Sequence, residues 1–426
     1  MLKEQKNNKP ASIGRKEIDV NDDCSYSLDE MQIWLNKLRT DDRDSAFEFF
    51  IEYLENNLLP PAIYPGFQGA ILSILPFLHE LTDESKDNFL DIITTIAEFL
   101  VEIDDFGEIF DLIWAEIPRH SAFFAASSLI EKHFDVASLF INSEYLKELE
   151  NIIQTVSNQD IEPILGFFMA LAHQKELFSH VKDLYTHVFN YAISYDYDIK
   201  KSCLSILTQV ASFDAGVTYI QEHPHLVDLF KGIHLSSPCL YSSLKLIESI
   251  VKNTEHPLKV LQQAECLHII VLSFESDERR ILMIIASICY CIALDESGGI
   301  QYLLDSGILM IFFRWNEKPF SIWLAALRVL CQSVSFSDDI MELFIENGFI
   351  DYLAEALTCS DLPIILQILI ALQNIIATKT EHGDSAFMDA LLTNDSLFEE
   401  ISSVMERFPG TMPATVASII LKEYEI

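Results

Sequence analysis

The chain has 426 residues, 50% of them hydrophobic, and 65 acids against 28 bases give it a formal net charge of −37. This charge excludes a nucleic-acid-binding protein, because neutralised phosphates supply most of the affinity for nucleic acid, and it also argues against binding to an anionic membrane. The acidity favours basic partners, or else it only keeps an apolar-rich chain in solution.

Neither a membrane span nor a secretory signal is expected. The longest uncharged apolar stretch, residues 281–294, is shorter than the roughly 20 residues that a span requires. The N-terminus lacks an apolar core segment. The eight cysteines are scattered, and Cys289 and Cys291 have no second pair to complete a zinc site. We therefore expect a soluble intracellular protein with buried packing thiols and no cofactor.

Residues 1–27 form the only basic segment, and their poor apolar content predicts disorder in the free protein. Its five bases are Lys3, Lys6, Lys9, Arg15 and Lys16. From Ser27 the pattern becomes helical, because Ser27 and Glu30 form a capping box before an apolar stripe. A second helix is expected over residues 44–55, before the Pro60-Pro61 break.

Six segments with the same apolar pattern then recur at steps of 40 to 42 residues, each at a predicted helix start. Their anchor residues are Tyr145, Tyr185, His225, Cys266, Ile308 and Phe349. A helical repeat of this length is typical of a stacked solenoid of the armadillo or HEAT type. No single repeat can bury its apolar faces alone, so we expect residues 28–426 to form one all-α, right-handed superhelical solenoid.

The last helix of each repeat is the most apolar. These helices are predicted over residues 201–212, 242–252, 280–294, 322–334 and 363–377. Leu207, Ile247, Ser287 and Leu327 follow one another at steps of 40 residues within them. In the armadillo arrangement this third helix lines the inner side of the solenoid. Gly307 and Gly348 stand between two helices of a repeat, where a tight turn is expected.

Several stretches, taken in order and spacing, resemble the importin-α family. Near the N-terminus they are Ser27-Leu-Asp-Glu30, Thr40-Asp-Asp-Arg-Asp44, Leu59-Pro-Pro-Ala-Ile63 and the Gly66-led helix. Residues 360–376 are similar to the penultimate repeat of that family, and Lys422-Glu-Tyr424 is similar to the end of its last repeat. Residues 5–21 resemble a thinned form of its importin-β-binding segment.

The resemblance implies a nuclear-import adaptor with an armadillo-repeat solenoid, present in the cytoplasm and the nucleus. A basic protein or peptide cargo would lie in the groove. An importin-β-type carrier would bind the basic segment through Lys3, Lys6, Lys9, Arg15 and Lys16. An armadillo scaffold that takes no part in import is the alternative, and it would have no need of that segment.

The family's groove uses a tryptophan followed four residues later by an asparagine on successive third helices. The tryptophan stacks on a cargo lysine, and the asparagine amide holds the peptide backbone. Here Leu327 stands four positions after Trp323, and none of the four tryptophans is followed by the asparagine. The corresponding pairs are predicted at Ser205/Gln209, Ser287/Cys291, Leu327/Cys331 and Ile370/Asn374. The ladder is therefore lost, which predicts an altered cargo groove.

No motif indicates catalysis. The sequence contains no phosphate-binding glycine loop, no nucleophile elbow and no paired metal-binding histidines of the HExxH kind. The closest histidine cluster, His223-Pro-His225, is expected to pack or to be solvated. We therefore expect a binding protein and not an enzyme.

Overall fold

The computed structural model describes residues 27–423, except 41, 57–58, 101–105, 142–143, 156–160, 195, 335 and 383–393. Within these residues every regular element is an α-helix or a 3-10 helix, and no strand is present. The predicted all-α solenoid is confirmed. The chain divides into two compact units, residues 1–139 and 140–426. Residues 1–26 of the predicted basic segment, with Lys3, Lys6, Lys9, Arg15 and Lys16, lie outside the described residues.

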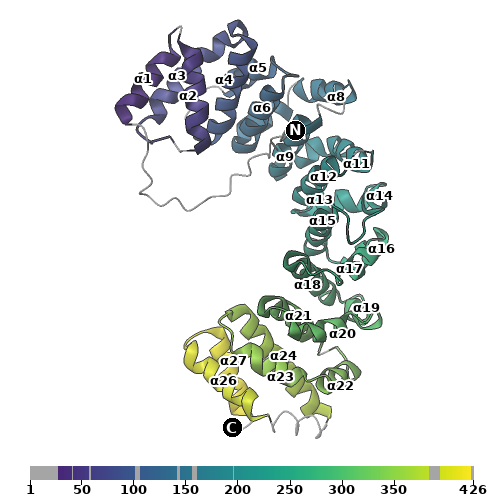
Figure 1. Cartoon of the computed structure of the whole chain (residues 1–426). Helices are drawn as coiled ribbons and strands as arrows, with labels where there is room; N and C mark the ends of the chain where they lie inside the picture. Colours follow the sequence, from purple (N-terminus) through teal and green to yellow (C-terminus); the bar gives the residue numbers. More distant parts are fainter. Residues whose placement is uncertain are drawn as a thin grey trace, which may run out of the picture. The chain divides into compact units, whose positions relative to one another are not determined.

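The first unit is a set of paired helices, in which α2, α4 and α6 pack against one another in chain order (Figure 1). Its α-helices are α1 (Leu28–Leu38), α2 (Arg43–Asn56), α3 (Tyr64–Ile74), α4 (Asp83–Ile96), α5 (Phe106–Trp114) and α6 (His120–Lys132). Two 3-10 helices, Leu75–Glu80 and Ala97–Phe99, follow α3 and α4. Helix α7 (Phe134–Ile141) runs across the boundary between the units.

The start of the first unit agrees with the sequence pattern. The Ser27 amide donates to Glu30 Oε2 at 2.7 Å, and the Glu30 amide donates to Ser27 Oγ at 3.3 Å, which completes the predicted capping box. Helix α2 extends the expected 44–55 helix by one residue at each end.

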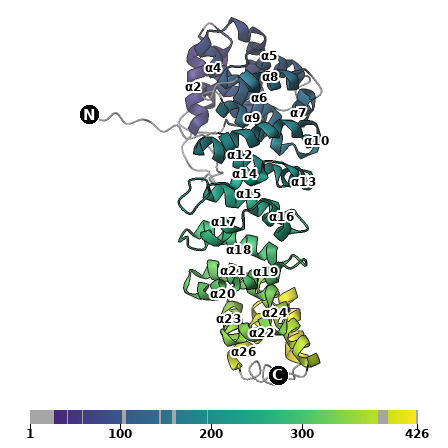
Figure 2. The ribbon, with the colours of Figure 1, turned by 90° about the vertical axis from the view of Figure 1, so that its right-hand side faces the viewer.

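The second unit is built from repeats of three helices (Figure 2). The first helices are α10 (Phe178–Val181), α13 (Asp214–Glu222), α16 (Pro257–Gln263), α19 (Gly299–Asp305) and α22 (Asp338–Glu346). The second helices are α8 (Tyr145–Thr155), α11 (Tyr185–Ser194), α14 (Leu226–Phe230), α17 (Leu267–Ser273), α20 (Ile308–Phe313), α23 (Phe349–Leu357) and α26 (Asp395–Arg407). The third helices are α9 (Ile161–His173), α12 (Tyr197–Val210), α15 (Leu240–Lys252), α18 (Arg279–Ala293), α21 (Phe320–Ser333), α24 (Leu362–His382) and α27 (Met412–Glu423). Short 3-10 helices flank α10 at Lys175–Leu177 and Lys182–Leu184, and one follows α20 at Arg314–Glu317.

The six anchor residues mark the starts of second helices, as predicted. Four of them are the first residue of α8, α11, α20 or α23, and His225 and Cys266 directly precede α14 and α17. Gly307 and Gly348 precede α20 and α23 with φ of 72° and 78°. A residue with a side chain is strained in this left-handed region, so glycine suits the tight turn between the first and second helices.

The third helices form one continuous row in the second unit, in which each packs against the next from α9 to α27 (Figures 1 and 2). Leu207, Ile247 and Leu327 are fully buried in this row. Ser287, which was placed in the same series by a step of 40, is only half-buried. The row thus supplies the shared core that a single repeat lacks.

Two glycines allow a first helix to begin directly against the end of the preceding third helix. A Cβ atom at Gly299 would lie 1.7 Å from the Ile292 carbonyl oxygen, and one at Gly216 would lie 1.9 Å from the Val210 carbonyl oxygen. No side chain fits at such a distance, so the first turns of α13 and α19 require glycine at these positions.

Gly299→Ala is expected to destabilise the protein by about 1–3 kcal/mol, because the backbone must shift to admit the methyl group. The measurement is thermal unfolding followed by circular dichroism. Gly69→Ala is the control. Gly69 lies in α3, and a Cβ atom there would meet only Arg39 Nη2, at an ordinary contact distance of 3.7 Å. If Gly299→Ala unfolded at the same midpoint temperature as the wild-type protein, the close approach of residue 299 to the Ile292 carbonyl would be contradicted.

Candidate protein-binding face

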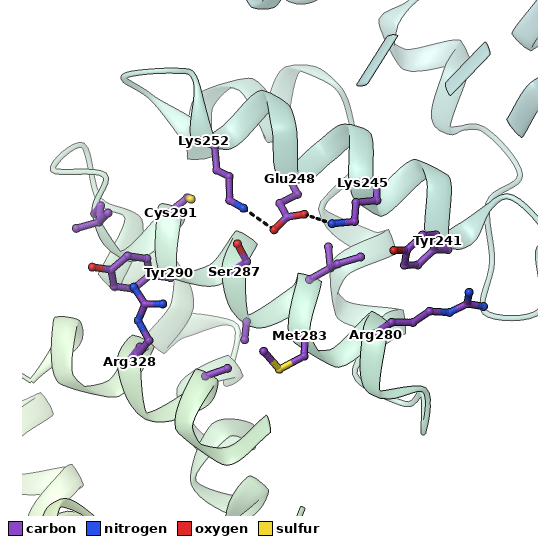
Figure 3. Close-up of a pocket in the computed structure, with 14 residues that line it drawn as sticks. Tyr241, Lys245, Glu248, Lys252, Arg280, Met283, Ser287, Tyr290, Cys291 and Arg328 are labelled. Atoms are coloured by element: carbon purple, nitrogen blue, oxygen red, sulfur yellow. Dashed lines mark hydrogen bonds and ion pairs between the residues drawn. The ribbon is translucent and has the colours of Figure 1, made fainter. Parts of the chain in front are cut away.

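Three neighbouring third helices, α15, α18 and α21, enclose an open hollow of about 620 Å³ on the surface of the second unit (Figure 3). Its charged lining consists of four cations, Lys245, Lys252, Arg280 and Arg328, and one carboxylate, Glu248. We call this site the cationic hollow. It stands out on a chain whose formal net charge is −37.

Helical spacing places the α15 side chains in the hollow. Tyr241, Lys245, Glu248 and Lys252 recur at intervals of three or four residues and therefore share one face of α15. The opposite face carries the buried core residues of the same helix. The apolar face of α15 packs against the neighbouring third helices, so its polar and charged side chains face the hollow.

Glu248 is held between two lysines. Lys245 Nζ donates to Glu248 Oε2 at 2.9 Å, and Lys252 Nζ donates to Oε1 at 2.7 Å (Figure 3). Burial alone would raise the pKa of Glu248, but hydrogen bonds from Lys252, Lys245 and Ser287 outweigh it and leave that pKa below its usual range. The carboxylate is therefore ionised at neutral pH, and its negative charge is already paired with the two lysines.

Two arginines of the hollow lie over tyrosine rings of the preceding third helix. The Arg280 guanidinium carbon is 4.7 Å from the ring centre of Tyr241, and that of Arg328 is 4.8 Å from the ring centre of Tyr290. The two pairs lie on either side of the hollow (Figure 3). These cation–π contacts hold the guanidinium groups in place and cover one face of each tyrosine.

Each arginine also has a hydrogen-bonded neighbour. Arg280 Nε donates to Glu278 Oε2 at 2.8 Å, and both side chains are exposed. Arg328 Nε donates to Gln367 Oε1 on α24 at 3.1 Å. Since Gln367 is neutral, the charge of Arg328 remains uncompensated by this contact, whereas that of Arg280 is partly offset at the surface.

Six of the predicted groove residues lie on the surface of the third helices. Ser287 and Cys291 line the cationic hollow. The others lie on α12 and α24: Ser205, Ile370 and Asn374 are exposed and Gln209 is half-buried. The predicted positions on these helices therefore reach the face where a ligand could bind.

The prediction for α21 is wrong by one position. Trp323, Leu327 and Cys331 are 3%, 0% and 5% exposed, so they belong to the core. The steps between the anchor residues vary between 40 and 42 residues, and a shift of one residue corresponds to a rotation of about 100° around a helix. The surface pair of α21 is Arg328, which is exposed, and Gln332, which is half-buried.

The cations of the hollow were not identified from the sequence, although a signal for them exists. The third helices α12, α15, α18 and α21 together with residues 362–377 contain only two acids, Asp198 and Glu248. Their seven bases are Lys200, Lys201, Lys245, Lys252, Arg279, Arg280 and Arg328. Counting charge by helix, and not over the whole chain, would have located this reversal.

The histidine cluster has a packing role. The rings of His223 and Phe189 are stacked with their centres 3.7 Å apart, and His225 Nδ1 lies 3.0 Å from Asp228 Oδ2. Among the described residues no group of three His, Cys, Asp or Glu side chains gathers as a metal site. None of the described helices is long and apolar enough to span a membrane.

No family model and no curated protein matches the sequence. An engineered structural-genomics target is similar in structure, with a TM-score of 0.69 at 15% identity over 93% of this chain and 98% of that one. Importin beta, crystallised in an ammonium sulfate condition, is similar with a TM-score of 0.60 at 12% identity, over 91% of this chain and 51% of its own. A computationally designed armadillo repeat protein for modular peptide recognition matches 54% of this chain and 99% of its own, at 14% identity and a TM-score of 0.48. At these identities the likeness shows the fold alone, an armadillo/HEAT-like helical repeat solenoid.

Glu248→Gln is expected to lower the free energy of unfolding by about 1 kcal/mol at neutral pH, because two half-exposed lysines lose their shared counter-charge. The folded-state pKa of Glu248 is lowered, so its contribution is present above the ordinary value of 4.5 and is lost as pH falls through the lowered pKa. The difference between variant and wild type should therefore shrink in acid.

Urea unfolding of both proteins between about pH 7 and pH 3 measures this difference. Glu278→Gln is the control, because its partner Arg280 and Glu278 itself are both exposed, and its effect should be close to zero. A Glu248→Gln difference that is independent of pH would contradict the ion pair.

Proposed function

We propose that this protein is a non-catalytic scaffold that binds an extended segment of a partner protein along the third helices of its second unit. The continuous row of third helices carries this proposal, because it presents a repeated set of surface side chains from α12 to α24. An extended chain rises about 3.3–3.6 Å per residue, and packed helices lie about 8–10 Å apart. A peptide lying across the row would therefore meet a new helix about every three residues.

The chemistry of the face supports binding and not catalysis. The side chains in the hollow are cations, a carboxylate paired with two of them, tyrosines, apolar side chains and small groups. The thiol of Cys291 has a raised pKa because of burial, so it is poorly suited to act as a nucleophile. Nothing in this set pairs a nucleophile with a free base.

A peptide library of about 12 residues per member tests this function, since that length spans about five helices. Peptides enriched on the wild-type protein should lose at least about tenfold in affinity on Ser287→Trp, whose indole would fill the hollow. Gln301→Trp is the matched control on the exposed surface of α19 and should bind normally. Failure to enrich peptides, or equal binding by Ser287→Trp, would contradict the proposal.

A divergent importin-α-like adaptor is the more specific candidate. It is supported by the resemblance of the sequence to that family and by the five bases of residues 1–27 in an otherwise acidic chain. In this role residues 1–27 bind an importin-β-type carrier, and the protein moves between the cytoplasm and the nucleus with a restricted set of cargo.

Charge reversal at Lys9, Arg15 and Lys16 is expected to weaken binding to a purified importin-β-type carrier in proportion to the number of substitutions. Each exposed contact contributes about 0.5–1 kcal/mol and is screened by salt. Titration calorimetry of the full chain, the triple variant and a chain lacking residues 1–27 measures the effect. Equal carrier binding by the shortened chain would contradict the assignment of the carrier site to residues 1–27.

A further inference from the structure

We propose that the cationic hollow recognises aspartate and glutamate side chains of an extended acidic polypeptide segment. This inference rests on the proposed function and names the class of partner that the same face selects. It reverses the charge preference that the overall composition favours.

The local charge is positive because the cations outnumber the carboxylates that face them. Lys245, Lys252, Arg280 and Arg328 line the hollow with Glu248 alone, and Glu278 contacts Arg280 beside it. Arg279 adds a further positive charge at the same edge. A basic peptide crossing α15, α18 and α21 would meet net repulsion at close range, whereas peptide carboxylates would be attracted.

The contacts of Tyr241 and Tyr290 also favour an acidic ligand over a basic one. In a groove that holds a cargo lysine, an aromatic face must be open to receive the cation. Here one face of each ring is already occupied, that of Tyr241 by Arg280 and that of Tyr290 by Arg328. The protein supplies the cations itself, and each stack orients a guanidinium whose donors suit a carboxylate.

The two arginines come from successive third helices, α18 and α21. Packed helices are about 8–10 Å apart, a distance that an extended peptide covers in about three residues. Arg328 lies over Tyr290, which is ten residues and about 15 Å beyond Arg280 along α18, so carboxylates about four or five residues apart would meet Arg280 and Arg328 in turn. Lys245 and Lys252 on α15 extend the row of cations by one helix.

A polypeptide fits this face better than a nucleic acid does. A nucleic acid carries a charge on every nucleotide and gains affinity from each phosphate that the protein neutralises. The cations here are confined to a few helices of a chain with 65 acids against 28 bases. A long polyanion would meet repulsion on leaving the hollow, whereas a peptide can place two or three carboxylates there and remain neutral elsewhere.

Fluorescence anisotropy with the full chain tests the inference. The probes are labelled peptides of about 12 residues with glutamate, glutamine or lysine at every fourth position, matched in all other residues. The glutamate peptide is expected to bind at least about tenfold more tightly than the lysine peptide at about 0.1 M salt, and this preference should shrink as salt rises.

Two variants separate the hollow from overall charge. Arg280→Gln/Arg328→Gln should weaken glutamate-peptide binding about tenfold, while Lys147→Gln/Lys231→Gln removes the same charge from exposed lysines elsewhere and should change it less than about twofold. Glu248→Gln should strengthen binding about threefold, because it removes the one carboxylate of the hollow. A gain of affinity cannot come from damage to the fold.

The outcomes distinguish the two proposals. Tighter binding of the lysine or glutamine peptide would overturn the acidic preference and leave the scaffold function standing. Absence of binding by all three peptides, together with failure of the library selection, would overturn both. Tighter binding of a single-stranded oligonucleotide, or binding of a phosphoserine peptide without the glutamate peptide, would overturn the assignment to acidic side chains.

Discussion

Burial of the third helices against one another is the constraint on which the second unit depends. Each of these helices is too apolar to face water, and each packs against the third helix of a neighbouring repeat as well as against helices of its own repeat. The junction glycines Gly216 and Gly299 exist because the next repeat must begin against the end of this helix. Stability and binding surface therefore come from the same row.

Because one face of each third helix is committed to the core, the remaining positions are free to vary in charge. In α15, α18 and α21 they carry cations, although the chain as a whole is strongly acidic. Charge at a distance steers approach and is screened within about 10 Å at ordinary salt, whereas charge in the hollow acts at contact. In the proposed function, the local set of side chains, and not the net charge, would decide which peptide the face binds.

The fold could be predicted from the sequence in detail, because a period of about 41 residues and the apolar pattern both report the packing. The anchors fall at helix starts, and the capping box at Ser27 and Glu30 forms as expected.

The site could be predicted only in part. A fixed step of 40 residues from Ser287 leads to Leu327, which is buried. The exposed residue at this place on α21 is the next one, Arg328. The contact of Arg328 with Tyr290 joins two repeats, and periodicity within one chain does not reveal which surface residues meet across helices.

Photo-cross-linking of a bound peptide is the most direct test of the account. A peptide selected on the wild-type protein would carry a photoreactive residue at its centre, and mass spectrometry would identify the residues it joins. The account predicts cross-links to exposed residues of α15, α18 and α21, among them those that line the cationic hollow. Cross-links confined to the second helices α14, α17 and α20 would contradict the assignment of the binding face.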